Sequence, residues 1–352
     1  MEHSLPPEIR LDHSEGRERS IPLCLDLDET LLRTDIVWES AAQLWHRPVV
    51  AFRALQTLCF KGKAAFKLVL ATEVNIDPAT LPYRQEVLEF AQAQRATGRA
   101  LVLATAAHRI VAQRVADYLG LFARVFATEG ETNLSGEAKL LALESCYGKR
   151  GFDYVGDGRR DLPVFAGARA ALLVNPSRAL LERAAENKNI LGVFSDDDSK
   201  VRVVARALRL HQWVKNVLLV VPLLAAHKVM DPRAWAYVAL SFVAFGLVAS
   251  ATYLLNDLVD LQADRRHPQK RSRPLASGRM SIPIGLLSAI SFGALGAAFA
   301  RHLLSAGFCG YLAVYVALTL GYSFDLKRRL LVYPLEIILA SAAKCNLLRP
   351  VS

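Results

Sequence analysis

Two carboxylates separated by one residue, Asp26 and Asp28, follow a short apolar segment near the start of the chain. A carboxylate can attack phosphorus and form an aspartyl-phosphate, and a second one two positions on can protonate the leaving oxygen and later activate water. Asp157 and Asp161 follow another apolar segment. Magnesium is a hard cation that binds one or two carboxylates together with phosphate and water. These residues therefore indicate metal-assisted phosphoryl chemistry.

Thr105 and Lys139 offer a hydroxyl and an ammonium group that could neutralise phosphoryl oxygens. Short apolar segments alternate with helical patterns around these residues, which predicts an α/β domain with a parallel sheet. Such a sheet places its ligands at the carboxyl ends of its strands, where these polar residues lie. The predicted strands are Ile21–Leu27, Ala100–Ala104, Arg124–Ala127, Phe152–Val155 and Ala170–Val174.

This set resembles the haloacid dehalogenase-like (HAD) hydrolase superfamily over about residues 20–178, with all of its motifs in order. The resemblance implies that Asp26 is the nucleophile and Asp28 the general acid/base, and that Thr105 and Lys139 bind phosphate. Magnesium would then be held by Asp26, Asp28, Asp157 and Asp161, the last in a supporting position.

A mainly helical insert at about 33–82 would form the cap over the substrate in this resemblance. Two other interpretations remain open at this point. The Asp residues could be ordinary turn and cap residues, or the domain could be an inactive scaffold.

The second half of the chain has a different character. From residue 201 onward there are 18 Lys/Arg against 6 Asp/Glu, whereas the residues before it hold 25 against 27. These cations lie between long apolar runs, so we expect a membrane protein and no nucleic-acid partner. The apolar runs are Trp213–Ala226, Ala234–Leu255, Ile282–Ala300, Leu303–Ser323 and, more weakly, Leu330–Ala343.

The runs of about 20 apolar residues are long enough to cross a bilayer. The cationic loops 256–280 and 324–329 should lie in the cytoplasm by the positive-inside rule. The first twenty residues are polar, so we expect no cleavable signal peptide and a cytoplasmic N-terminal domain.

Three carboxylates, Asp257, Asp260 and Asp264, follow the second apolar run at spacings that place them on one helical face. Their mutual repulsion is costly unless cations occupy that face. The cationic run 267–274 comes next, and carboxylates that hold magnesium beside Lys and Arg suit a diphosphate. The alternative is an ordinary cytoplasmic loop whose cations only set the topology.

The pattern NDxxDxxxD followed by HPxKRxRP resembles the UbiA-type intramembrane prenyltransferase superfamily, over about residues 205–335. The opening LHQWVKN at 210–216 resembles its polyprenyl-phosphate phosphoribosyltransferase branch. The resemblance implies transfer of phosphoribose from phosphoribosyl pyrophosphate to a polyprenyl (decaprenyl) phosphate, a membrane lipid. It implies a magnesium site at Asn256, Asp257, Asp260 and Asp264, and phosphate or substrate contacts from Lys215, Asn216, Lys270 and Arg273.

A HAD domain ahead of a UbiA-type domain is also an arrangement of bacterial proteins, so we expect a bacterial inner-membrane location. The UbiA pattern weakens from Pro334, and no second acidic motif follows the four or five predicted helices. We therefore expect a partial bundle caused by a frameshift or truncation, unless a homo-oligomer or a partner chain completes it.

These patterns predict four regions: a polar tail 1–20, a HAD-like domain 21–178, a linker 179–204 and a partial UbiA-type domain 205–352. Besides the phosphoribosyltransferase, two functions stay open. One is an aromatic prenyltransferase that uses a prenyl diphosphate. The other is a membrane-anchored HAD phosphatase with a non-functional transferase remnant.

Overall fold

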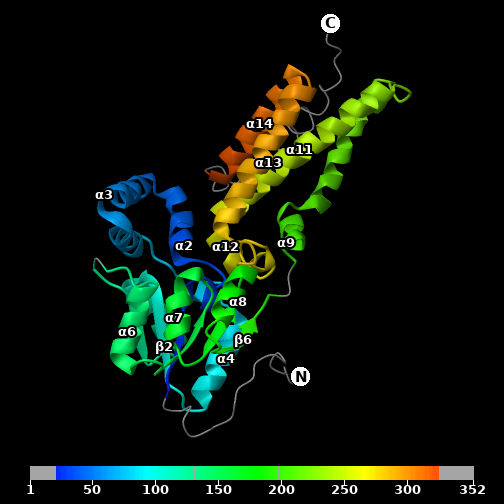
Figure 1. The fold of residues 1–352 in the computed structure, drawn as a ribbon. Coiled ribbons are helices and arrows are strands. Elements are labelled where there is room, and N and C mark those ends of the chain that lie inside the picture. Colours follow the sequence, from blue (N-terminus) through cyan, green and yellow to red (C-terminus); the bar gives the residue numbers. More distant parts are fainter. Residues whose placement is uncertain (1–20, 131, 197–198, 325–352) are drawn as a thin grey trace. The chain divides into compact units, whose positions relative to one another are not determined.

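The computed structural model describes residues 21–130, 132–196 and 199–324. The chain divides into two compact units, Met1–Asp197 and Asp198–Ser352, each of which is described here by itself (Figure 1). The predicted tail over 1–20 and the weak membrane segment Leu330–Ala343 lie outside the described residues.

The first unit is built on a parallel six-stranded sheet with the strand order β3-β2-β1-β4-β5-β6. Cys24 in the central strand pairs with Val102 on one side and Tyr154 on the other. Because parallel sheets are covered on both faces, their strands are continuously apolar, as the sequence predicted. The strands are β1 (Leu23–Leu25), β2 (Leu101–His108), β3 (Arg124–Thr128), β4 (Asp153–Gly156), β5 (Ala171–Val174) and β6 (Ile190–Phe194).

Helices cover both faces of this sheet, and a separate apolar cluster lies on each face. The predicted α/β class is confirmed. The helices are α2 (Ile36–Gln43), α3 (Pro48–Glu73), α4 (Gln85–Ala96), α5 (Arg109–Leu119), α6 (Glu137–Tyr147), α7 (Leu162–Gly167) and α8 (Arg178–Ala185). Short turns complete the unit: η1 (Leu27–Leu31), η2 (Leu44–His46), η3 (Pro78–Thr80) and η4 (Arg159–Asp161).

The structure differs from the predicted linker over 179–204. Helix α8 begins at Arg178 and extends into that range, strand β6 lies inside it, and β6 pairs with β5 as the last strand of the sheet. An edge strand has a backbone partner on one side only, and four of the five residues of β6 are only partly buried. Its sequence signal is therefore short and weak.

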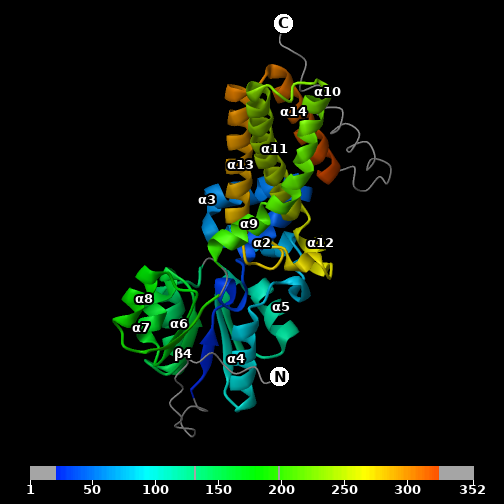
Figure 2. The same cartoon turned by 90° about the vertical axis from the view of Figure 1, so that its right-hand side faces the viewer.

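Over residues 199–324 the second unit is all-helical, as predicted. Helices α11 and α13 lie side by side (Figure 2), and a Cβ at Gly296 would meet the Val248 side chain at 2.7 Å. Its elements are α9 (Lys200–Ala207), η5 (Leu210–Val220), α10 (Val221–Ala225), α11 (Pro232–Val259), α12 (Leu261–Arg266), η6 (Lys270–Ser272), α13 (Ile282–Leu303) and α14 (Ala306–Phe324).

Two of these helices, α11 and α13, are long and apolar enough to cross a membrane. They contain the predicted spans Ala234–Leu255 and Ile282–Ala300. The predicted span Leu303–Ser323 corresponds to α14, whose apolar stretch Ala306–Gly321 is shorter. The apolar run Trp213–Ala226 forms η5 and α10 rather than one continuous α-helix.

Candidate functional site

Asp26 stands at the carboxyl end of β1, at the point where the chain enters turn η1. Its backbone N–H donates to the Val155 carbonyl of the neighbouring strand β4 at 2.9 Å. The Leu27 N–H donates to Asp26 Oδ1 at 2.8 Å. The turn is irregular, because Glu29 has a positive φ of 55°. Both hydrogen bonds fix the carboxylate at the edge of the sheet.

Lys139 of α6 joins the carboxylates of two separate elements. Its Nζ donates to Asp26 Oδ2 at 2.8 Å, to Asp161 Oδ1 at 3.0 Å and to the Tyr154 hydroxyl at 2.8 Å. The Tyr154 hydroxyl in turn donates to Asp161 Oδ1 at 3.0 Å. Burial opposes the ammonium charge, but the two carboxylates raise the pKa of Lys139 above its ordinary value. Lys139 is therefore a fixed positive charge beside Asp26.

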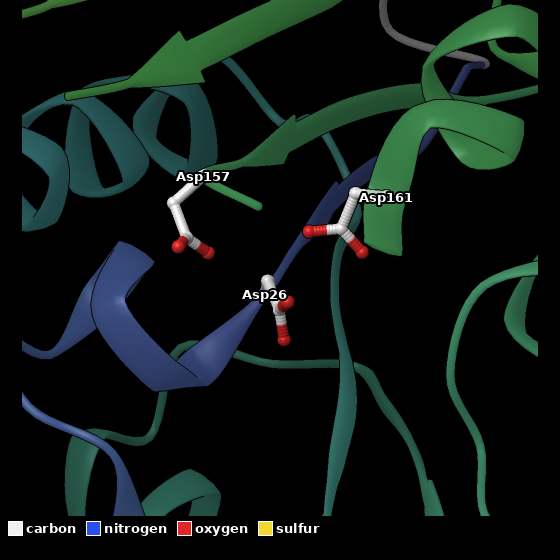
Figure 3. Close-up of side chains that lie close together, drawn as sticks. All are labelled: Asp26, Asp157 and Asp161. Atoms are coloured by element: carbon white, nitrogen blue, oxygen red, sulfur yellow. The ribbon is translucent and has the colours of Figure 1, made fainter. Parts of the chain in front are cut away.

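Asp26, Asp157 and Asp161 form an acidic cluster (Figure 3). Each contributes an oxygen, and these oxygens lie within 4.8 Å of one another. The Thr30 hydroxyl donates to Asp157 Oδ1 at 3.0 Å. Burial, together with the negative charges of Asp26 and Asp161, raises the pKa of Asp157 to about 9. Lys139 contacts Asp26 and Asp161 of this cluster, and the three carboxylates together are a donor set that fits a magnesium ion.

Asp28 lies outside that cluster, although the sequence prediction included it among the metal ligands. Its Oδ1 accepts the Ile36 N–H at 2.8 Å, at the start of α2. Burial and the nearby carboxylates of Asp35 and Asp26 raise the pKa of Asp28 well above its ordinary value. A carboxyl group in this environment is suited to donating a proton.

Thr105 is fully buried in β2, where the pairing with β3 shifts register between Ala104 and His108. Its hydroxyl oxygen accepts the Ala107 N–H at 3.0 Å. The irregular pairing thus lies next to Thr105, and β2 continues to His108. Of the residues predicted for this site, the structure brings Asp26, Lys139, Asp157 and Asp161 together.

Lys67 of α3 is a residue that the sequence analysis did not single out. Its Nζ donates to the Ala106 carbonyl at 2.5 Å and to Asn133 Oδ1 at 2.7 Å. Lys67 and His108 are the basic residues that line a small depression, together with Ile36 and Ser40 of α2. Burial lowers the pKa of Lys67, while the carboxylate of Asp28 opposes this change. Its only sequence signal is that Lys61 and Lys63 stand shortly before it.

Arg84 was also not predicted as a site residue. It supports turn η1, which follows Asp26. Its guanidinium donates to the carbonyls of Thr30 at 3.3 Å and Glu29 at 3.4 Å, and to Asp196 Oδ1 at 2.6 Å. Arg33 donates to the same Asp196 oxygen at 2.7 Å. Although burial opposes it, these bonds lower the pKa of Asp196. Arg84 is therefore a positioning residue for turn η1.

Replacing Arg84 by methionine should lower kcat for phosphate-ester hydrolysis by about tenfold to a hundredfold, because a misplaced nucleophile reacts slowly. KM should change less than kcat. Steady-state kinetics on a soluble phosphate monoester checks this. Arg178→Met is the matched control, because Arg178 is exposed on α8 and pairs only locally with Glu182. If Arg84→Met and Arg178→Met lowered kcat equally, Arg84 would not be a positioning residue for turn η1.

A second group of carboxylates lies in the second unit. Arg273 NH1 donates to Asp257 Oδ1 at 3.0 Å and to Asp264 Oδ2 at 2.6 Å. Lys270 Nζ lies 3.8 Å from Asp264 Oδ1. The predicted single helical face is interrupted, because α11 ends at Val259 and α12 begins at Leu261. One guanidinium nevertheless brings Asp257 and Asp264 together.

Asn256 and Asp260 are half-buried at this helix break, and the Asp260 N–H donates to the Asn256 carbonyl at 2.8 Å. Arg209 is a further residue that the sequence analysis missed. Its NH2 donates to Asp257 Oδ1 at 2.5 Å, and its guanidinium lies 5.3 Å from the Tyr253 ring centroid. Two arginines thus face Asp257, the first residue of the carboxylate ladder Asp257, Asp260 and Asp264.

Lys215 and Asn216 lie on η5, which packs against α11. The Trp213 indole donates to Ser250 Oγ at 3.0 Å and fixes η5 to that helix. Lys215 is exposed, whereas Asn216 is buried, and its Nδ2 has no hydrogen-bond acceptor among the described residues. A buried amide without an acceptor is costly, and a ligand oxygen would satisfy it. The carboxylates and cations of this unit are a donor set that fits a magnesium diphosphate.

Two family models match the chain, one in each unit. Residues 23–166 match the haloacid dehalogenase-like hydrolases, and residues 217–343 match the UbiA prenyltransferase family. The chain joins a HAD-like hydrolase region to a UbiA-type region. Both are families of enzymes, and the UbiA family is integral to membranes, in agreement with the apolar helices α11 and α13.

Known relatives match both regions. The uncharacterized protein y4nM of Sinorhizobium fredii is 38% identical over 88% of this chain and 60% of its own length. The decaprenyl-phosphate phosphoribosyltransferase of Mycobacterium tuberculosis is 38% identical over 40% of this chain and 46% of its own length. The chain therefore spans only about half to three-fifths of these relatives.

Among solved structures, a phospho-aspartyl intermediate analogue of phosphoserine phosphatase is similar to this chain. It is 15% identical, with a TM-score of 0.36, and the match covers 53% of this chain and 98% of that one.

Proposed function

We propose that the first unit hydrolyses a phosphate monoester through Asp26. The observation that carries this is the contact of Lys139 with both Asp26 and Asp161, beside Asp157. Magnesium bound at Asp26, Asp157 and Asp161 would supply charge neutralisation for the phosphoryl oxygens. Lys139 holds one Asp26 oxygen, so the carboxylate is oriented before substrate arrives.

In this reaction an Asp26 oxygen attacks phosphorus, and the bond from phosphorus to the ester oxygen breaks. Asp28, whose pKa is raised by burial, gives its proton to the leaving alkoxide. The resulting Asp28 carboxylate then takes a proton from water. That water attacks the phosphorus of the aspartyl-phosphate and releases inorganic phosphate and the free Asp26 carboxylate.

We propose that the second unit transfers phosphoribose from phosphoribosyl pyrophosphate to a polyprenyl phosphate. Support comes from the matched phosphoribosyltransferase region and from the cations that face Asp257 and Asp264. A phosphate oxygen of the lipid attacks the anomeric carbon, and the bond from that carbon to diphosphate breaks. Asn256, Asp257, Asp260 and Asp264 would hold magnesium, while Lys215, Asn216, Lys270 and Arg273 would contact the phosphates.

On chemical grounds, the first unit can act on the product of the second. The phosphoribosyl lipid still carries a 5-phosphate monoester, which is the bond type that the first unit would cleave. We propose that this reaction takes place at the cytoplasmic face of a bacterial inner membrane, and the cationic loop 256–280 supports this.

The test uses the full chain in lipid nanodiscs with polyprenyl phosphate. We expect label from phosphoribosyl pyrophosphate, and not from a prenyl diphosphate, to enter the lipid fraction. Labelling from prenyl diphosphate alone would replace this proposal by an aromatic or other prenyltransferase. Phosphate release from the phosphoribosyl lipid tests the first unit. If the chain hydrolysed soluble sugar phosphates but not the phosphoribosyl lipid, the proposed order of reactions would be rejected.

Metal removal should stop both reactions. Chelation with EDTA is expected to lower each rate at least about a hundredfold, because both sites rely on carboxylates that bind Mg²⁺. Adding back magnesium should restore them. A rate that is unchanged by EDTA after dialysis would contradict the metal role in that unit.

A further inference from the structure

The first half of the cap helix α3, residues 48–61, exposes large apolar side chains. Phe60 is 85% exposed and Val49 74% exposed. Gly62 has a φ of +82° and separates this half from the second half, whose Leu70 and Ala71 are buried. The large apolar side chains that are exposed on this half and the turn before it are Trp45, Val49, Phe52, Leu55, Leu58 and Phe60.

Three of these side chains lie on the side of the helix away from the buried one. Ala54 is the buried residue of this half, so its side marks the face toward the rest of the unit, and Leu58 lies on that same side. Val49, Phe52 and Phe60 follow one another at spacings of three and eight residues, on the opposite face. When the outer face of a helix is also apolar, that face typically contacts a membrane or another protein.

The surrounding charge has one sign. Between Glu39 and Glu73 the chain holds five Lys/Arg and no Asp/Glu, although residues 1–200 together hold slightly more acidic than basic residues. Lys61 and Lys63 are exposed at the end of this half. An exposed apolar face with flanking cations is the pattern of a helix that lies in the interface of an anionic membrane.

We propose that the outer face of residues 48–61 docks on the anionic surface of the bilayer that the second unit spans. The aromatic and aliphatic side chains enter the interface, and the cations contact lipid phosphates. The second half of α3 carries Lys67, which contacts the Ala106 carbonyl one residue beyond Thr105. The cap thus links a lipid contact to the edge of the hydrolase site.

This link implies that the hydrolase site receives the phosphate monoester of a membrane lipid, and that implication rests on the proposed hydrolase function. The docking proposal itself does not rest on the hydrolase function. The two are tested separately by measuring hydrolysis of para-nitrophenyl phosphate in every preparation used below.

Two exposed native cysteines provide the probe and its matched control. Cys59 lies on the exposed first half of α3, and Cys146 lies on α6 in the same unit. Full-length variants that keep one of these thiols, with the other exposed thiol and Cys309 and Cys345 replaced by serine, are labelled with bimane. They are then placed in nanodiscs of phosphatidylglycerol with brominated acyl chains, which quench only on contact.

We expect bimane at Cys59 to be quenched at least about threefold more strongly than bimane at Cys146. The double variant Phe52→Glu/Phe60→Glu should remove this difference, and so should zwitterionic lipid at high salt. Para-nitrophenyl phosphate hydrolysis should remain within about twofold in that variant.

Equal quenching at the two positions would overturn the docking proposal, even if hydrolysis is intact. A Cys59 thiol that is protected from reagents but not quenched would show that protein covers this face, and would overturn it as well. Loss of hydrolysis in the unmodified chain would instead reject the proposed function and leave the docking result interpretable.

Discussion

Replacing Asp26 by asparagine is expected to lower phosphate-ester hydrolysis at least about a thousandfold, equivalent to about 4 kcal/mol of transition-state stabilisation. An amide cannot form the acyl-phosphate that a carboxylate forms. The substitution also leaves Lys139 with only one of its two carboxylate partners, Asp161. Phosphate release in nanodiscs measures the loss, and transfer from phosphoribosyl pyrophosphate should continue.

Asp117→Asn is the matched control, because this exposed carboxylate of α5 accepts a hydrogen bond from Gln113 and lies outside the acidic cluster. Its rate should stay within about twofold. A cooperative melting curve near that of the unmodified chain would show that Asp26→Asn still folds. Hydrolysis that survives in a folded Asp26→Asn protein would reject the nucleophile assignment.

The sheet was largely predictable because its strands are buried on both faces and therefore read as unbroken apolar runs. Ala170–Val174 is such a run, and β5 occupies Ala171–Val174. Strand β6 was not predicted, since it lies at the edge and contains Gly192 in a short sequence. Edge strands carry less of the core and so leave a weaker pattern.

The convergence of Asp26 and Asp157 was predictable from sequence because β1 and β4 are parallel neighbours whose carboxyl ends meet. The role of Tyr154 was not predictable, because a tyrosine is an ordinary residue in a buried strand. Only the fold brings its hydroxyl to Lys139. The role of Arg84 depends on its contact with Asp196, which lies far away in the chain. Contacts of this kind arise from tertiary packing, so no local spacing in the sequence predicts them.

In the second unit the sequence predicted that cations must face the carboxylate ladder, and the structure identifies two of them. Arg273 comes from the predicted cationic run, whereas Arg209 precedes the first apolar run and has a positive φ of 51°. Both guanidiniums contact Asp257. Asp257 is therefore the carboxylate on which the charge balance of this proposed site depends most.

Replacing Asp257 by asparagine is expected to lower phosphoribosyl transfer at least about a hundredfold and to leave phosphate-ester hydrolysis unchanged. The loss removes a proposed magnesium ligand and the partner of two guanidiniums, and metal-site residues commonly carry effects of this size. Transfer of label into the lipid fraction measures it. Magnesium-dependent protection of the full chain by diphosphate in a thermal shift assay should be lost in parallel.

Asp231→Asn provides a control at the other end of the same helix. Asp231 caps α11 by accepting the Arg233 N–H at 2.9 Å, and asparagine caps helices about as well as aspartate. Transfer should therefore persist in this variant. If Asp257→Asn retained both transfer and diphosphate protection, the ladder would be a structural ion-pair group. Hydrolysis by the first unit would then be the activity that the chain retains.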